Sequence, residues 1–231
     1  MRKLLLLALL TLAPAPVDAS CMQASLTPVV LTRRDTNLPA DGGVLVGYTY
    51  ATGDNREDSG PDPSDVKWTA TAGKTKIELV RTQLAPGLSV YRPAATVTAF
   101  KLATKTKDHG SFTHATTGAA TAMAAPKPHA VKTKSTHNER WSTSTSTLVL
   151  DAAAPADAVA IIAYDTNGKP LLFATLPDTH DKLLEFEIDS SGGHCGTLTP
   201  PEHSGLYGKI AFAYVDAFGR LSAQSKPISA Q

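Results

Sequence analysis

Short runs of β-forming residues, each closed by Pro, Gly, Asn or Asp, recur along most of this chain and leave little room for helices. In "KIAFAYV", Ile210, Phe212 and Tyr214 fall on one face of an extended strand. "LLEFEI" at 183–188 alternates in the same way, with glutamates between the apolar residues. Apolar residues at every second position predict half-buried antiparallel strands. We therefore predict an all-β protein.

Two turn signals and a weak internal repeat organise these strands. The Asn-Gly pair in "DTNGKP" at 165–170 predicts a hairpin, and "DAFGR" at 216–220 predicts a second tight turn. "LPADGGVLVGYTYATG" at 38–53 aligns with "APADAVAIIAYDTNG" at 154–168, so that Pro-Ala-Asp recurs before a β-rich run. The repeat and the similar number of strands in each half predict two similar β-domains.

The segment between the two halves has a different composition. Residues 104–147 are rich in Ser, Thr and Lys and hold few large apolar side chains, which predicts a flexible linker or long exposed loop. The predicted domains are then 20–103 and 148–231. The alternative is one larger sandwich that carries 104–147 as an insertion.

The last strands resemble bacterial immunoglobulin-like and fibronectin type III-like domains. The final hairpin of such domains often has the pattern aromatic-x-V-x-A-x-D-x-x-G-N-x-S. Here Tyr214, Val215, Asp216, Gly219 and Ser222 fall into similar places, with Arg220 in place of the usual Asn. The resemblance implies two antiparallel immunoglobulin-like β-sandwich domains joined by a long flexible linker, used for adhesion, spacing or recognition. It carries over no functional residue, because such folds host many functions.

The first 19 residues have the pattern of an export signal. A charged start precedes the apolar run Leu4–Leu12, and small residues precede a cleavage position after Ala19. The apolar run is about half the ~20 residues that a spanning helix needs, so we expect no transmembrane anchor. A lipoprotein linked through Cys21 is the weaker alternative, because Asp18 stands where such sites carry Leu. We expect a secreted or periplasmic protein of a Gram-negative bacterium.

The charges of the exported chain balance. Removal of the signal leaves equal numbers of basic and acidic residues, so no global charge directs the protein to nucleic acid or to anionic membranes. The basic, Thr-rich residues 104–147 have the composition of a nucleic-acid-binding tail but lack interleaved aromatic residues. We therefore expect no nucleic-acid partner.

Two cysteines in an exported chain predict one disulfide, and Cys21 with Cys195 is the only intramolecular pair. Such a long closed loop contributes up to about 5 kcal/mol in the chain-entropy model. A catalytic dyad of Cys195 with the adjacent His194 is disfavoured, because neighbouring side chains in a strand point to opposite faces.

Histidines and acidic residues give two candidate metal sites. His109 and His114, in the polar stretch "DHGSFTH", are the best candidates for copper or zinc, although solvated loop histidines explain them more simply because their spacing matches no ligand motif. Asp54, Asp58 and Asp62 lie in the acidic stretch 52–65 and are candidates for calcium. The alternative there is a soluble turn region, since the D-x-D-x-D-G pattern is missing.

No nucleophile elbow, Walker, zinc-protease or dinucleotide-binding motif occurs in the sequence, and no catalytic residue is predicted. We therefore expect an exported, non-enzymatic envelope protein that binds or spaces a macromolecular partner, either an unknown protein or another envelope component. The first alternative is a periplasmic copper- or zinc-binding protein that uses histidines. The second is an enzyme without a recognisable motif.

Overall fold

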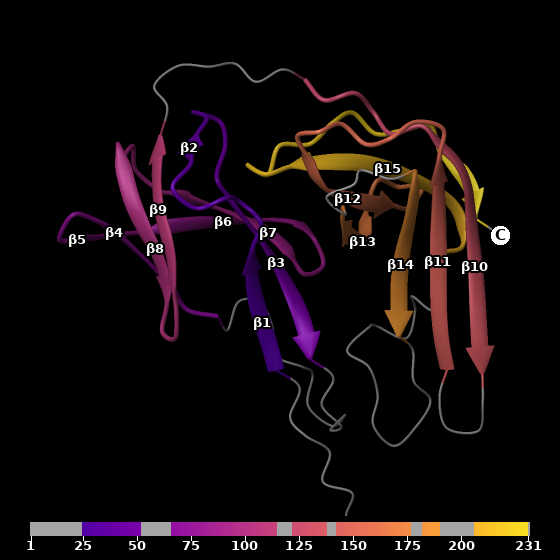
Figure 1. Ribbon diagram of the computed structural model, residues 1–231, viewed down its shortest axis with the longest axis horizontal. Coiled ribbons are helices and arrows are strands. Elements are labelled where there is room, and N and C mark those ends of the chain that lie inside the picture. The colour runs from indigo at the N-terminus through magenta and orange to yellow at the C-terminus, as the bar shows by residue number, and fades with distance from the viewer. Residues whose placement is uncertain are drawn as a thin grey trace, which may run out of the picture.

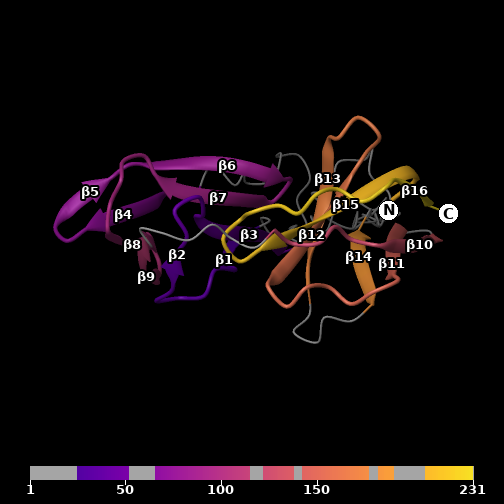
Figure 2. The same ribbon diagram turned by 90° about the horizontal axis from the view of Figure 1, so that it is seen from above.

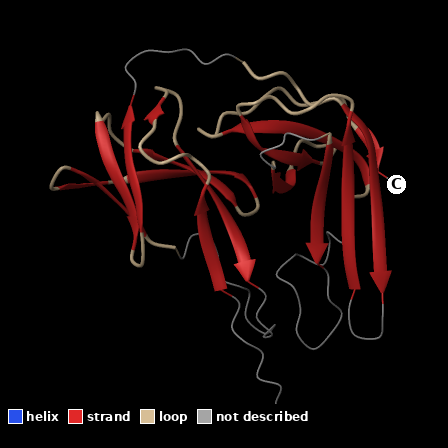
Figure 3. Cartoon of the chain, viewed as in Figure 1, coloured by secondary structure: helices blue, strands red, loops and turns tan. Residues whose placement is uncertain are grey.

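A computed structural model describes residues 25–51, 66–114, 122–137, 142–176, 182–189 and 206–230. Every regular element in these ranges is a strand (Figures 1 and 3), which confirms the all-β class. The described residues contain no helix that is long and apolar enough to cross a membrane. The predicted export signal lies outside the described residues and stays a prediction.

The first half of the chain forms two sheets that pack face to face. Sheet A consists, in spatial order, of β1 (Ser25–Val30), β3 (Val44–Ala51), β7 (Leu88–Pro93) and β6 (Leu79–Ala85). Sheet B consists of β2 (Asn37–Leu38), β9 (Asp108–His114), β8 (Ala99–Thr104), β4 (Trp68–Ala72) and β5 (Thr75–Ile77). Apolar residues of both sheets meet in one buried cluster, here called the first core, which includes Val44, Val46, Phe100, Leu102 and Phe112.

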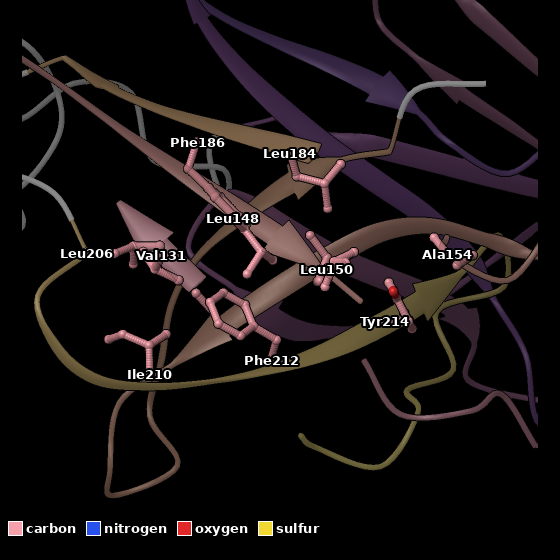
Figure 4. Close-up of a cluster of buried hydrophobic side chains, with 13 residues drawn as sticks. Val131, Leu148, Leu150, Ala154, Leu184, Phe186, Leu206, Ile210, Phe212 and Tyr214 are labelled. Carbon is pink, nitrogen blue, oxygen red and sulfur yellow. The ribbon is translucent and has the colours of Figure 1, made fainter. Parts of the chain in front are cut away.

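The second half forms one seven-stranded sheet that folds over itself. Sheet C consists of β13 (Pro170–Thr175), β12 (Ala158–Tyr164), β15 (Gly208–Asp216), β16 (Ile228–Ala230), β10 (Pro128–His137), β11 (Ser142–Leu150) and β14 (Leu183–Asp189). The short strand β16 joins its two parts, pairing antiparallel with β15 and parallel with β10. The parts enclose a second core, in which Leu148, Leu184 and Phe186 face Ile210 and Phe212 (Figure 4).

The expectation of a linker or long loop over residues 104–147 is wrong for the described part of that range, because β9, β10 and most of β11 lie there. A strand needs apolar residues on only one face, and single residues such as Phe112 and Val131 supply them. Ser146 is buried as well, and its hydroxyl bonds Thr133 Oγ1 at 2.8 Å. A count of large apolar side chains misses strands of this kind.

The two halves share a third cluster of buried side chains, here called the junction core. Leu45, Leu88 and Val90 of sheet A pack there against Ile162 and Val215 of sheet C. Residues 44–48 of β3, strand β12 and most of β15 are therefore buried on both faces, and the expectation of a half-buried strand at 209–215 is corrected. The face of β15 opposite its large apolar residues carries alanines, which allow sheet A to approach closely.

The Pro-Ala-Asp repeat marks equivalent turns. The Gly42 amide donates to the Pro39 carbonyl at 2.9 Å, and the Ala158 amide donates to the Pro155 carbonyl at 3.0 Å. Each turn leads into a strand that is buried on both faces, β3 in one half and β12 in the other. The structure thus supports the internal repeat and places its two copies on either side of the junction core.

Both predicted turns are confirmed, and they share one geometry. Asp165 and Asp216 each accept two backbone amide hydrogen bonds through Oδ1, and each turn closes on a glycine with positive φ, Gly168 at 77° and Gly219 at 76°. The turn after β15 extends toward sheet A (Figure 2), where Phe218 packs against the first core. A turn of the second half therefore completes the core of the first.

Candidate binding hollow

An open hollow lies at the corner of the first half, where the chain passes from the edge strand of sheet B to the edge strand of sheet A. It measures about 360 Å³, and Glu78 is the single residue that connects β5 and β6 there. The residues that line it are Val66, Trp68, Lys76, Ile77, Glu78, Leu79, Arg81 and Tyr91. Apolar and aromatic groups are thus combined with exposed charges.

The aromatic side chains at the hollow are held by a hydrogen-bonded network. Tyr48 and Tyr91 share a hydrogen bond between their hydroxyl groups at 2.6 Å, and Trp68 donates Nε1–H to the Tyr48 oxygen at 3.0 Å. The Trp68 ring also lies against the rings of Tyr91 and His109, with ring centroids 5.3 Å and 4.9 Å away. The hydrogen bond and these two ring contacts therefore fix the orientation of Trp68.

Burial and hydrogen bonding at the hollow favour the neutral form of Tyr91. Burial, and then the hydrogen bond with Tyr48, raise the pKa of Tyr91 well above its ordinary value, so its phenol stays protonated even in alkaline solution. Arg81 donates Nε–H to Ser89 Oγ at 3.1 Å, which holds the guanidinium beside the hollow. Lys76 and Glu78 are exposed at its border. The arrangement suits recognition of a group with an apolar face and polar substituents.

The structure gives His109 an environment that the sequence did not predict. It lies in β9 with 3% of its surface exposed, and its Nε2 is 3.3 Å from Thr104 Oγ1. Burial, with the nearby cations Lys107 and Arg34, lowers the pKa of His109 below its ordinary value. The simpler interpretation of His109 as a solvated loop histidine is therefore wrong. Its place against Trp68 makes it part of the support for the hollow.

The predicted copper or zinc site stays a prediction. His114 is the last residue of β9, the same strand that carries His109. In the described part of the chain, no three His, Cys, Asp or Glu residues gather in a way that suits a metal ion. His129 lies elsewhere, exposed, with Nδ1 3.2 Å from Asp151 Oδ1.

The remaining predicted site residues fall in parts of the chain that the structure does not describe. Cys21 and Cys195 lie outside the described residues, and so do the calcium candidates Asp54, Asp58 and Asp62. The disulfide and the calcium site therefore stay predictions.

The comparison with family models finds no match, and no curated protein matches the sequence significantly.

Sequence reasoning missed Trp68, Tyr91 and Arg81 as site residues. The only signals were a Trp in "VKWTATA" and a Tyr in "LSVYRP", and nothing in the sequence shows that these two runs meet.

Proposed function

We propose that this chain is an exported, non-enzymatic protein of the bacterial envelope that binds a macromolecular partner through the corner hollow. One observation carries the proposal: the hollow combines the preoriented ring of Trp68 with the charged side chains of Lys76, Glu78 and Arg81. Aromatic side chains and Arg dominate the binding energy of many protein interfaces.

The size and openness of the hollow favour a large partner over a small ligand. A volume of about 360 Å³ is at the lower end of the range in which pockets bury most of a small molecule, roughly 300–1,000 Å³. An open site of this size accommodates one protruding group, which a larger partner presents while it contacts the surrounding surface. The exposed edge strands β5 and β6 border the hollow and extend that surface.

The chemistry of the described lining residues supports binding rather than acid–base catalysis. Glu78 is the single acid among them. Tyr91 is unsuited to act as a base, because it stays protonated at neutral pH and shares its hydroxyl group with Tyr48.

The immunoglobulin-like character of the two halves is part of this proposal. The face-to-face packing of sheets A and B, the folded sheet C and the hairpin that carries Asp216 and Gly219 support it. Together with the predicted export signal and disulfide, these features favour a role in recognition or spacing at the cell surface or in the periplasm.

Quantitative capture from envelope extract tests the function. The full chain is immobilised and compared with the double variant Lys76→Glu/Glu78→Lys, which exchanges two charges at the border without changing the net charge. We expect at least one envelope component to bind the wild type and to lose about tenfold or more in recovery on the variant. Lys101→Glu, an exposed change in β8 of the same half, serves as the control and should retain the component.

Two results contradict the proposal. One is a set of captured components that is the same for the wild type and the border variant. The other is turnover of a hydrolase substrate panel by the purified chain that persists after removal of trace enzymes, since this shows an active site elsewhere.

A further inference from the structure

The outer face of β10, β11 and β14 arranges its side chains in columns of different chemistry. The register places Lys132 beside Thr147, and Thr147 beside Glu185. Two residues further along β10, Lys134 lies beside Thr145. Lys132, Lys134 and Glu185 are exposed, whereas both threonines are partly covered. A basic column on β10 is thus separated from an acid on β14 by a neutral column on β11.

The alternation of the strands establishes that this is the outer face. Val131, Leu148 and Leu184 are aligned with one another and belong to the second core. Residues one position away along each strand therefore point to the opposite side. The strands lie side by side in Figure 1.

One end of the same face is apolar. The register aligns Ala130 with Val149 and Val149 with Leu183. Leu183 exposes 53% of its surface, which makes it one of the most exposed large hydrophobic residues in the described part of the chain. This row has a small residue at the β10 side and a large one at the β14 side.

We propose that this face binds the same face of a second copy of the chain, around a two-fold axis that runs parallel to β11. Rotation about this axis places β10 of one copy over β14 of the other. Lys132 then lies opposite Glu185 of the second copy, and Ala130 lies opposite its Leu183. Charge and side-chain size are therefore both complementary.

The charge columns discriminate between the possible symmetric arrangements. A two-fold axis perpendicular to the strands places the lysine column of one copy over the lysine column of the other, which is repulsive. Only the axis along β11 pairs opposite charges. The resulting ion pairs lie at the rim of the interface, while Thr147 and Val149 meet their own counterparts at its centre. Sheets packed in this way are aligned within about 30°.

This interface is independent of the corner hollow. The hollow lies between sheets A and B, and the proposed interface lies on sheet C. A dimer of this kind leaves one hollow on each copy free to bind. The failure of either proposal therefore leaves the other intact.

A charge-exchange experiment tests the interface directly. Sedimentation velocity of the full chain is measured with a reductant present, so that cysteine-linked dimers do not contribute. We expect the wild type to dimerise with increasing concentration, and Lys132→Glu and Glu185→Lys each to weaken dimerisation about tenfold or more. In an equimolar mixture of the two variants, a mixed dimer again has opposite charges at both contacts, because each introduced charge faces the other. The mixture should therefore restore dimerisation to within about threefold of the wild type.

The matched control is Lys101→Glu, which makes the same charge change on an exposed position of sheet B and should leave dimerisation unchanged. Circular dichroism confirms that each variant is folded. A wild type that remains monomeric at about 0.5 mM overturns the proposal. So does a dimer that both charge variants retain, or a mixture of folded variants that fails to associate.

Discussion

The backbone amide of Gly43 donates a hydrogen bond to the carbonyl oxygen of Phe218 at 3.0 Å, and this bond joins the two halves of the chain. A second link lies beside it, because the buried hydroxyl of Thr32 donates to the Ala217 carbonyl at 2.6 Å and accepts from the Leu45 amide at 2.7 Å. With the junction core beneath them, these contacts make the turn after β15 part of both halves.

Gly219→Ala should destabilise the protein strongly. A methyl group at this glycine lies 2.0 Å from Val90 Cγ2, and the φ of 76° already disfavours any side chain. We expect the free energy of unfolding, measured by urea denaturation, to fall by about 3 kcal/mol or more.

Gly168→Ala is the matched control, since this glycine has nearly the same φ in the same kind of turn and no atom within 4 Å of the added methyl group. The Gly168→Ala variant should lose only about 1 kcal/mol of unfolding free energy, because the positive φ disfavours a side chain but no neighbouring atom clashes with it. Equal losses in the two variants contradict the close packing of the turn against sheet A.

Asp216→Ala should cost more stability than Asp165→Ala. Both carboxylates accept two backbone amides within their turns. Asp216 is in addition 2% exposed and accepts Arg220 Nε–H at 2.6 Å. Its removal leaves the partly buried guanidinium with only the longer 3.7 Å contact to the exposed carboxylate of Asp41. We expect a loss of about 3 kcal/mol at Asp216 and about 1 kcal/mol at Asp165, measured by thermal unfolding. A larger loss at Asp165 refutes this ranking.

Stability should fall as the pH falls through the titration of His109. Its pKa in the folded chain is lowered by burial, so the unfolded chain binds the proton more readily. The neutral ring therefore makes its full contribution to the free energy of unfolding above the unfolded pKa of about 6.5. This contribution is lost as the pH falls from there through the lower pKa of the folded chain.

His109→Gln should flatten the fall in unfolding free energy between about pH 7.5 and pH 5, as measured by urea denaturation at several pH values. If His109→Gln retains the wild-type dependence of the unfolding free energy on pH, His109 does not have the buried environment described for it.

The strand pattern was readable from the sequence, but the relation between the two halves was not. Alternation identified the apolar face of β15 that includes Phe212, and turn residues identified both hairpins. The alanines on the other face of β15 gave no comparable signal, because small residues suit both a solvated face and a close contact between sheets. The sequence therefore predicted separate domains where the structure has a junction core.

The candidate site was less predictable than the fold. Trp68 and Tyr91 lie on strands of different sheets, and only tertiary packing brings their rings to 5.3 Å. His109 was singled out for its imidazole chemistry, whereas its burial depends on β9 pairing with β8. A single sequence reveals local pattern, while contacts between distant strands need the fold.

The predicted disulfide has its own test. Non-reducing digestion and mass spectrometry of the natively produced protein should show a Cys21–Cys195 linked peptide about 2 Da lighter than the two thiol peptides together. Two alkylatable thiols in the native protein refute the pairing.

Whether the two halves form one body through the junction core is tested most directly by differential scanning calorimetry of the full chain. We predict a single transition whose calorimetric enthalpy equals its van't Hoff enthalpy, because Val90 and Phe218 cannot leave their neighbours in one half without exposing the other. The shared core is contradicted if the wild type shows two separated transitions and the Gly219→Ala substitution, which lies in the second half, leaves the transition of the first half unchanged.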